Sequence, residues 1–227
     1  MNKNNSVGLD DLRRRLTDEQ RAILSAIWEH YRDRDRWILR RALHQRFGKQ
    51  LVRSSLEQLG GSIFFESQEA GREVYCLTFL GILLTDQGEE TEELLTRYLD
   101  YIRGHFVSDP EIEKFEGKEI EIALGLSAQQ SDLLRLLIHF GHFWGNTASL
   151  GKGEWSVGVP YDIDDLPSVQ DLRAYVRTRA LKDYDPAVPV NDSDRIRFLL
   201  SRAQIEGEAN ELQFKNEADK HHQIQKS

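Results

Sequence analysis

Two histidines have a spacing that suits metal binding. His139 and His142 lie three residues apart near the end of an apolar stretch, where both imidazoles can reach one ion if a carboxylate such as Glu154 or Asp162 completes the ligand set. Phe140 and two further aromatic residues surround the pair, a setting typical of hydrogen-bonded packing histidines. We therefore expect these rings to pack, and we expect neither a metal ion nor a cofactor.

An acidic triplet and one cysteine are the other candidates for chemistry. Asp162, Asp164 and Asp165 could hold a divalent cation, but they lack the loop pattern that makes a calcium site specific, and a solvated turn is the alternative. Cys76, the single cysteine, has no adjacent basic residue to activate its thiol, so burial is expected. No glycine-rich phosphate loop or dinucleotide fingerprint occurs. These absences predict a protein that is not an enzyme.

Length and composition describe a globular protein. The chain has 227 residues, 39% of them hydrophobic, enough for one elaborate domain or two small ones. One cysteine allows no internal disulfide and no thiol cluster, which fits a reducing cytosol. No apolar run approaches the roughly 20 residues that a membrane span needs. We therefore expect a cytoplasmic protein without a membrane segment.

Charge is distributed unevenly along the chain. The net charge of −8 argues against indiscriminate binding to nucleic acid, but residues 1–60 hold 13 Lys and Arg against 8 Asp and Glu, a balance of +5. Residues 86–125 hold 4 against 12, a balance of −8. The densest basic window, residues 32–53, contains eight Lys and Arg and only two Asp. Such a window is either a phosphate-facing surface or a solvated helix face with local ion pairs.

The apolar periodicity of the first third predicts three helices. Thr17 and Gln20 have capping-box spacing at the start of a helix over 17–32. A second helix ends at Gly48, and a third over 49–59 turns its polar side chains outward. The inner positions of these helices carry Trp28, Leu39, Ala42, Leu43, Phe47, Val52, Leu56 and Leu59, and Trp28 and Trp37 are expected in the core.

A hairpin and a closing helix follow. Extended runs begin at Ile63 and at Val74, and the polar stretch 67–73 between them predicts a hairpin with a long polar tip. Thr78 can cap the next helix. Three helices, a hairpin and a closing helix form the winged helix-turn-helix plan.

The residues at the end of the hairpin carry a resemblance to a known family. Tyr75, Leu77, Thr78 and Gly81 match the pattern through which the second wing strand enters a helix, and residues 17–85 thereby resemble the winged-helix regulators of bacteria of the PadR and MarR kind. The resemblance implies a DNA-binding fold. By analogy, the helix from Lys49 to Gly60 is its recognition helix and Ser67 to Arg72 its wing.

Two features depart from that pattern. Glu57 lies on the outward face of the expected recognition helix, and the wing carries Glu66, Glu69 and Glu73 against one arginine. A wing that enters the minor groove is normally basic. Because winged helices also serve as protein-binding modules, the fold does not settle the partner.

The order of elements repeats in the second third. An acidic amphipathic helix over 89–103 is expected as a connector, and Ser127 with Gln130 gives a second capping-box spacing before a strongly apolar helix. Two extended runs, around Trp144 and over 155–159, follow between glycines. This order predicts a second, degenerate winged-helix unit without a basic surface.

The sequence therefore predicts an α+β protein, mainly helical with small β-hairpins, in five parts. These are a flexible N-terminus (1–16), a winged-helix domain (17–88), a second winged-helix-like domain (89–160), a C-terminal helical extension (161–205) and a polar tail (206–227). In the extension, a short helix near Leu172, a linker or strap over 185–189 and a last helix over 193–203 are expected.

We predict that the first unit binds double-stranded DNA as a transcriptional regulator, either as a homodimer or with a protein partner. Arg40, Arg41, Arg46 and Lys49 are expected to hold phosphates, Gln50, Arg53, Ser54 and Gln58 to reach base edges, and Arg72 to act in the wing. The alternative is a protein-binding adaptor or accessory subunit of a multiprotein bacterial system, which the net acidity favours.

Overall fold

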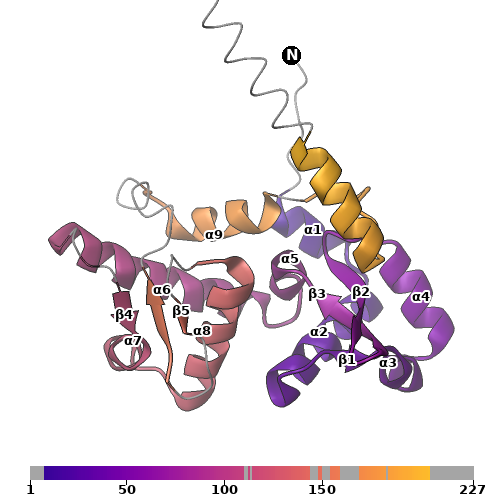
Figure 1. Cartoon of the computed structure of the whole chain (residues 1–227), viewed down its shortest axis with the longest axis horizontal. Coiled ribbons are helices and arrows are strands. Elements are labelled where there is room, and N and C mark those ends of the chain that lie inside the picture. Colours follow the sequence, from indigo (N-terminus) through magenta and orange to yellow (C-terminus); the bar gives the residue numbers. More distant parts are fainter. Residues whose placement is uncertain are drawn as a thin grey trace, which may run out of the picture.

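The computed structural model describes residues 8–109, 112, 114–143, 148–149, 154–158, 169–182 and 184–204. The fold is mainly helical with two small antiparallel sheets, as an α+β protein should be (Figure 1). Each sheet belongs to one half of the chain, and the two halves lie side by side. Within these residues, every helix is too short or too polar to cross a lipid bilayer.

The first half is built around a three-stranded sheet. Its elements are α2 (Asp18–Arg34), β1 (Ile38–Leu39), α3 (Arg40–Phe47), α4 (Lys49–Glu57), β2 (Phe64–Glu69), β3 (Arg72–Leu77) and α5 (Phe79–Leu83). The strand order is β1-β3-β2. β1 was not expected: its two residues pair with Tyr75 and Val74, and a strand this short leaves no periodic signal in the sequence.

Local chemistry sets the ends of these elements as expected. Thr17 and Gln20 form both hydrogen bonds of a capping box at the start of α2, and Thr78 caps α5. Gly48, with φ of 86°, separates α3 from α4. The hairpin differs from the prediction, because residues 67–69 and 72–73 pair as strands around Ala70 and Gly71, which both have positive φ. The tip is therefore a tight turn and not a long polar loop.

The second half repeats this order with different sequences. It comprises α6 (Gly88–Ser108), β4 (Lys114–Glu116), α7 (Gly117–Leu124), α8 (Ala128–Gly141), β5 (Ala148–Ser149) and β6 (Ser156–Gly158). The strand order β4-β6-β5 again places the third strand in the middle. The capping box of Ser127 and Gln130 is formed. The first strand expected near Trp144 corresponds to β5 instead, and Trp144 lies outside the described residues.

Helix α6 is a core helix, and the expectation of a connector is wrong. Leu95, Tyr98 and Ile102 are fully buried, and α6 contacts α5, α7, α8 and α9. Its acidic residues Glu89, Glu90 and Glu93 occupy the remaining exposed face. The apolar stripe was read correctly, but the sequence does not reveal how many elements pack on it.

The predicted flexible N-terminus also needs correction. Residues 9–15 form α1 (Leu9–Arg15), with Leu9 and Leu12 buried. Arg13 Nη2 lies 2.5 Å from Glu92 Oε1, and its guanidinium also donates to the Leu83 carbonyl. Two apolar residues and one buried ion pair therefore hold this segment against α5 and α6. Residues 1–7 lie outside the described part of the chain.

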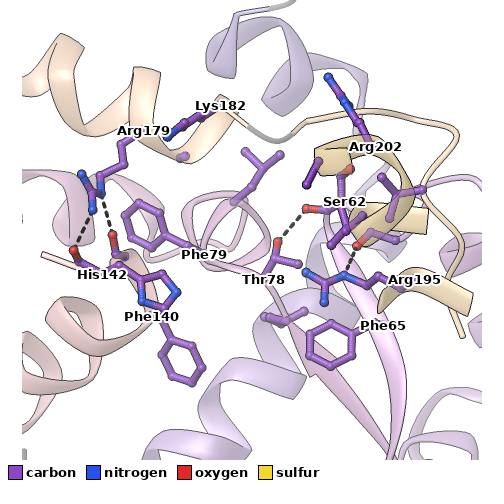
Figure 2. A pocket seen from close by; sticks show the side chains of 18 of the residues that line it. Ser62, Phe65, Thr78, Phe79, Phe140, His142, Arg179, Lys182, Arg195 and Arg202 are labelled. Atoms are coloured by element: carbon purple, nitrogen blue, oxygen red, sulfur yellow. Dashed lines mark hydrogen bonds between the residues drawn. The ribbon is translucent and has the colours of Figure 1, made fainter. Parts of the chain in front are cut away.

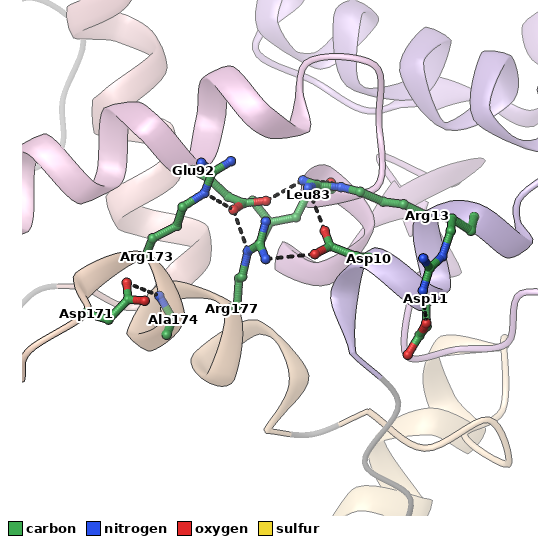
Figure 3. A network of polar contacts seen from close by, with 10 residues as sticks. Asp10, Asp11, Arg13, Leu83, Glu92, Asp171, Arg173, Ala174 and Arg177 are labelled. Carbon is green, nitrogen blue, oxygen red and sulfur yellow. Dashed lines mark hydrogen bonds and ion pairs between the residues drawn. The ribbon is translucent and has the colours of Figure 1, made fainter.

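Glu92 joins three helices (Figure 3). The carboxylate is fully buried on α6, and Arg173 Nε and Arg177 Nε of α9 (Leu172–Leu181) donate to its Oε2 at 2.9 and 2.7 Å. Together with Arg13, three guanidinium groups meet one carboxylate. Arg177 also pairs with Asp10 at 3.0 Å. Two arginines of α9 are therefore bound in this cluster.

An aromatic cluster connects the two halves. The Phe140 ring of α8 lies 6.0 Å from Trp28, 5.3 Å from Tyr31 and 5.6 Å from Trp37, measured between ring centroids. Trp28 and Trp37 are buried, as predicted for core residues. Contacts of this kind cross the boundary between the halves, so one core serves both.

The C-terminal extension returns to the first half. Residues 184–190 form a strap in which the Val188 carbonyl accepts from Gly61 N at 2.8 Å and the Asp185 carbonyl accepts from Ser62 Oγ at 2.7 Å. Residues 192–204 are helical and lie beside β2, where Asp192 accepts from Ser67 Oγ at 2.9 Å. The strap and the last helix were both expected. The tail from residue 206 lies outside the described residues.

Candidate nucleic-acid interface

Helices α3 and α4 carry most of the predicted DNA contacts. Leu43 of α3 and Val52 and Leu56 of α4 are buried, and these apolar positions turn the other faces of both helices outward. Gln20 anchors the far end of α4, because its Nε2 donates to the Ser55 carbonyl at 3.1 Å. The capping residue of α2 thus also fixes the orientation of the candidate recognition helix.

The outward face of α4 is open. Its members, which are all exposed, are Gln50, Leu51, Arg53, Ser54, Glu57 and Gln58. Two of the predicted base readers already make hydrogen bonds within the protein. Ser54 Oγ donates to the Leu51 carbonyl at 3.2 Å, and Gln58 Oε1 accepts from Gln20 at 3.2 Å. Gln50 and Arg53 extend from the same face.

Arg40 is placed differently from the prediction. Its Nη1 lies 3.2 Å from Glu73 Oε1 and 3.8 Å from Glu66 Oε2, and its side chain is only 24% exposed. Because two carboxylates of the sheet face this guanidinium, its charge stabilises the contact between α3 and the hairpin. Arg40 is therefore a weaker candidate for a phosphate contact than the sequence indicated.

The four other cations of α3 and α4 remain exposed without a carboxylate within ion-pair distance among the described residues. They are Arg41, Arg46, Lys49 and Arg53. The Arg46 guanidinium lies 5.1 Å from the centre of the Phe47 ring, which leaves its charge uncompensated. Arg72, at the start of β3, is exposed in the same way. On α3 and α4 the cations thus divide into one paired arginine, Arg40, and an exposed group of four.

A shallow hollow of about 380 Å³ lies beside α3. Arg41 and Lys49 line it together with His44, whose Nε2 is 3.1 Å from the Tyr75 hydroxyl. Desolvation lowers the pKa of His44, and Arg40 and Lys49 lower it further. Burial, followed by the charge of Glu66, raises the pKa of Tyr75 to about 12. Both groups are therefore neutral at pH 7, and the charge of the hollow comes from Arg40, Arg41 and Lys49 and from the carboxylate of Glu73, which also line it.

The other chemical candidates do not assemble into a site. Within the part of the chain that the structure describes, no three His, Cys, Asp or Glu residues are grouped to hold a metal ion. His139 and His142 lie at the exposed end of α8, and desolvation with the nearby His142 lowers the pKa of His139. Cys76 is buried, and burial raises the pKa of its thiol. Asp162, Asp164 and Asp165 lie outside the described residues.

Among the described residues of the second half, the helix that corresponds to α4 is more deeply buried than α4. In order along the chain, α8 corresponds to α4, but residues 133–138 of α8 are all buried. The exposed residues of α8 are Ala128 and Gln129 at its start and His139 near its end, so no long face of this helix is open. The expectation that the surface of the second unit is not basic stays a prediction.

Comparisons with protein-family models, with curated proteins and with solved structures found no match for this chain.

Proposed function

We propose that the first half is a winged helix-turn-helix unit that binds duplex DNA through α3 and α4. The observation that carries the proposal is the group of four exposed cations, Arg41, Arg46, Lys49 and Arg53, on two adjacent helices whose outer face is open. The element order and the strand order β1-β3-β2 support the assignment to this motif. The tight hairpin turn at Ala70 and Gly71 would be the wing.

The dimensions of α4 suit a major groove. Nine helical residues span about 14 Å, and the groove of B-form DNA is about 12 Å wide. Arg53 and Gln50 would face base edges, while Arg41, Arg46 and Lys49 would face phosphates on either side. Glu57 at the end of the helix would disfavour close approach there, because it faces the same negative backbone.

Salt dependence tests the proposal directly. If Arg41, Arg46 and Lys49 each neutralise one phosphate per protomer, the slope of log affinity against log salt should be about −2.7. The measurement is fluorescence anisotropy of a labelled random-sequence duplex, titrated with the full chain at several salt concentrations. A double variant, Arg41→Ala with Arg46→Ala, should reduce the slope by about 1.8.

A charge-matched control separates contact from net charge. Arg15→Ala with Lys118→Ala removes two exposed cations from α1 and α7 and should leave the slope within error of the wild type. Absence of binding even at low salt, or an equal effect of both double variants, would overturn the proposal.

A protein-binding adaptor is the second candidate. Large apolar side chains are exposed away from α4, with Ile122 at 73%, Leu200 at 65% and Ile196 at 49%. The buried α8 and the acidic residues of the hairpin also favour a protein partner for the remaining surface. If the DNA titration shows no binding at low salt, this function becomes the better assignment.

A further inference from the structure

The outer surface of α3 and α4 is cationic and partly apolar. Along residues 40–57 the only acidic side chain is that of Glu57, at the end of α4. Leu51 adds an apolar side chain that is 39% exposed. The exposed cations of this α3–α4 surface are Arg41, Arg46, Lys49 and Arg53. Such a surface attracts a segment that combines carboxylates with apolar side chains.

Acidic side chains of this chain already reach the neighbouring part of α3. Arg40 Nη1 lies 3.2 Å from Glu73 Oε1 and 3.8 Å from Glu66 Oε2, both on the hairpin. Within the described part of the chain, no carboxylate lies within ion-pair distance of the four exposed cations. A protein partner for these cations must therefore come from residues outside that part or from another molecule.

The sequence after the last helix has the opposite charge. Residues 206–219 contain five acidic residues and one lysine, a balance of −4, which is half of the chain's net charge of −8. Leu212 and Phe214 lie between Glu211 and Glu217. Carboxylates on both sides of two apolar side chains match a surface that carries both cations and an exposed leucine.

The last helix places the start of this acidic segment in the first half. The helix over 192–204 begins beside β2, where Asn191 forms a bridge with Glu66, and Glu66 faces Arg40 of α3 at 3.8 Å. Thirteen helical residues span about 20 Å. Residue 204 therefore lies within about 20 Å of a strand that contacts α3.

The acidic segment is long enough to return to α3 and α4. An extended chain spans at most about 3.3–3.6 Å per residue, so residues 205–219 can reach about 50 Å from the end of the last helix. A segment tethered to its binding site also has an effective concentration in the millimolar range. Weak surface ion pairs are therefore sufficient for substantial occupancy.

A larger cleft of about 680 Å³ beside the last helix is also basic, but its arginines are already engaged (Figure 2). Arg179 donates to two backbone carbonyls at the end of α8. Arg195 lies over the Phe65 ring, 4.6 Å from its centre, and Arg202 pairs with Asp185 at 3.2 Å. The α3–α4 surface is therefore the better site for additional carboxylates.

We propose that residues 206–219 bind to the α3–α4 surface of the same chain and compete there with nucleic acid. One carboxylate would enter the hollow beside α3, which Arg41 and Lys49 line, and others would face Arg46 and Arg53. The contact itself can be tested without DNA, whereas its effect on DNA affinity rests on the proposed function.

Carbodiimide cross-linking of the full chain tests the contact. The reagent joins a carboxylate to a lysine amine beside it, and mass spectrometry of the cross-linked monomer identifies the pair. Lys49 should be joined to residues 206–219, whereas Lys118, which is exposed on α7, should give less than about a tenth of this yield. Arg41→Ala with Arg46→Ala should lower the Lys49 yield about threefold, because it removes two of the attracting cations.

The cross-links also identify other arrangements. Lys182 lines the cleft (Figure 2), so cross-links from the acidic segment to Lys182 in place of Lys49 would locate the segment there and overturn the proposal. Cross-links that form only between two copies of the chain, or no cross-link to Lys49 at all, would overturn it as well.

Neutralising the acidic segment tests its effect on DNA. If the segment leaves the surface open in about one fifth of the molecules, its release should raise the affinity for DNA about fivefold. The measurement is fluorescence anisotropy of a labelled random-sequence duplex at low salt, with full chains. The variant carries Glu206→Gln, Glu208→Gln, Glu211→Gln and Glu217→Gln. The control, with the same change of charge on exposed positions of α6 and α7, carries Glu89→Gln, Glu90→Gln, Glu93→Gln and Glu119→Gln.

The control should change the affinity by less than about twofold. If the full chain binds duplex DNA but the two variants have equal affinities, the proposed competition is overturned and the proposed function stands. If no chain binds DNA even at low salt, the proposed function fails, and the competition fails with it. A cross-link to Lys49 would then support only the contact between the segment and the surface.

Discussion

Glu92 is a charged residue whose carboxylate is fully buried. Burial alone would raise the pKa of this carboxyl, but hydrogen bonds from Arg173 and Arg177 and the charge of Arg13 outweigh it, and the net pKa is lowered. A single buried carboxylate therefore faces three guanidinium groups that come from both ends of the chain, and Asp10 provides a second negative charge beside Arg177. Removing its charge leaves them facing one another in a buried site.

The variant Glu92→Gln should lower the free energy of unfolding by about 3–5 kcal/mol at pH 7, measured by urea denaturation. Glu93→Gln, on the exposed face of the same helix, is the control and should change it by less than about 0.5 kcal/mol. Equal stability of both variants would show that the Glu92 cluster makes no net contribution to the free energy of unfolding.

The same residue predicts a pH dependence. Because the folded-state pKa of Glu92 lies below the ordinary value of 4.5, its ionised form stabilises the fold fully above that pH. This contribution is lost as the pH falls through the folded-state pKa. The difference in unfolding free energy between wild type and Glu92→Gln should therefore be constant near neutrality and shrink below about pH 4.5. A difference that grows on acidification would contradict this.

Arg40 and Arg41 are adjacent in sequence but differ in environment. Arg41 is exposed without a carboxylate partner among the described residues, whereas Arg40 faces Glu73 and Glu66. Arg41→Ala should reduce the salt slope of DNA binding by about 0.9, and Arg40→Ala should reduce it by less, because its charge is already compensated. The slope of log affinity against log salt is measured for each single variant. Equal slopes would mean that both arginines contact phosphates.

At the scale of elements, two glycines show how closely the segments approach. A Cβ on Gly61 would lie 2.0 Å from the Pro189 carbonyl oxygen, and one on Gly81 would lie 2.1 Å from that of Ile63. Backbone atoms cannot yield as a flexible side chain can. The strap over 184–190 therefore packs directly on the loop before β2.

Gly61→Ala should detach the strap and lower the free energy of unfolding by about 1–3 kcal/mol. It should also speed proteolytic cleavage within residues 184–204, since the Gly61 N–Val188 O hydrogen bond would be lost. Gly104→Ala is the control: nothing lies within 4 Å of its Cβ position on α6, and this variant should be about 0.5–1 kcal/mol more stable. A strap that resists protease in Gly61→Ala would refute the account.

At the scale of the whole molecule, the two halves share one hydrophobic core. Phe140 of α8 contacts three aromatic side chains of the first half, and the Glu92 cluster connects α1, α6 and α9. Similar element orders in the two halves therefore do not imply independent folding. The domain boundary expected near residue 88 falls at the beginning of α6, and this helix packs against elements of both halves.

The variant Phe140→Ala should lower the free energy of unfolding by about 2–3 kcal/mol while denaturation remains a single transition. Tryptophan fluorescence, which reports on Trp28 and Trp37 in the first half and on Trp144 and Trp155 in the second, and far-ultraviolet circular dichroism should give the same midpoint. Leu126→Ala, at a partly buried position in the loop before α8, is a control within the second half alone. Two separate transitions would show that the halves fold independently.

Local sequence determined the elements whose ends depend on partners within a few residues. The capping boxes at Thr17 and Ser127, the break at Gly48 and the inner faces of α2, α4 and α8 formed as predicted, because hydrogen bonds and apolar periodicity over three to four positions decide them. Burial of Trp28, Trp37 and Cys76 followed from the same patterns.

Only the tertiary structure decided which charges remain available. The carboxylate that pairs with Arg40 is 33 residues away in the chain, and those that bind Arg173 and Arg177 are more than 80 residues away. The two-residue strand β1 likewise arises from segments that meet only after folding. Sequence spacing carries no information about such distant partners, so it identified a basic window but not which of its arginines are already compensated.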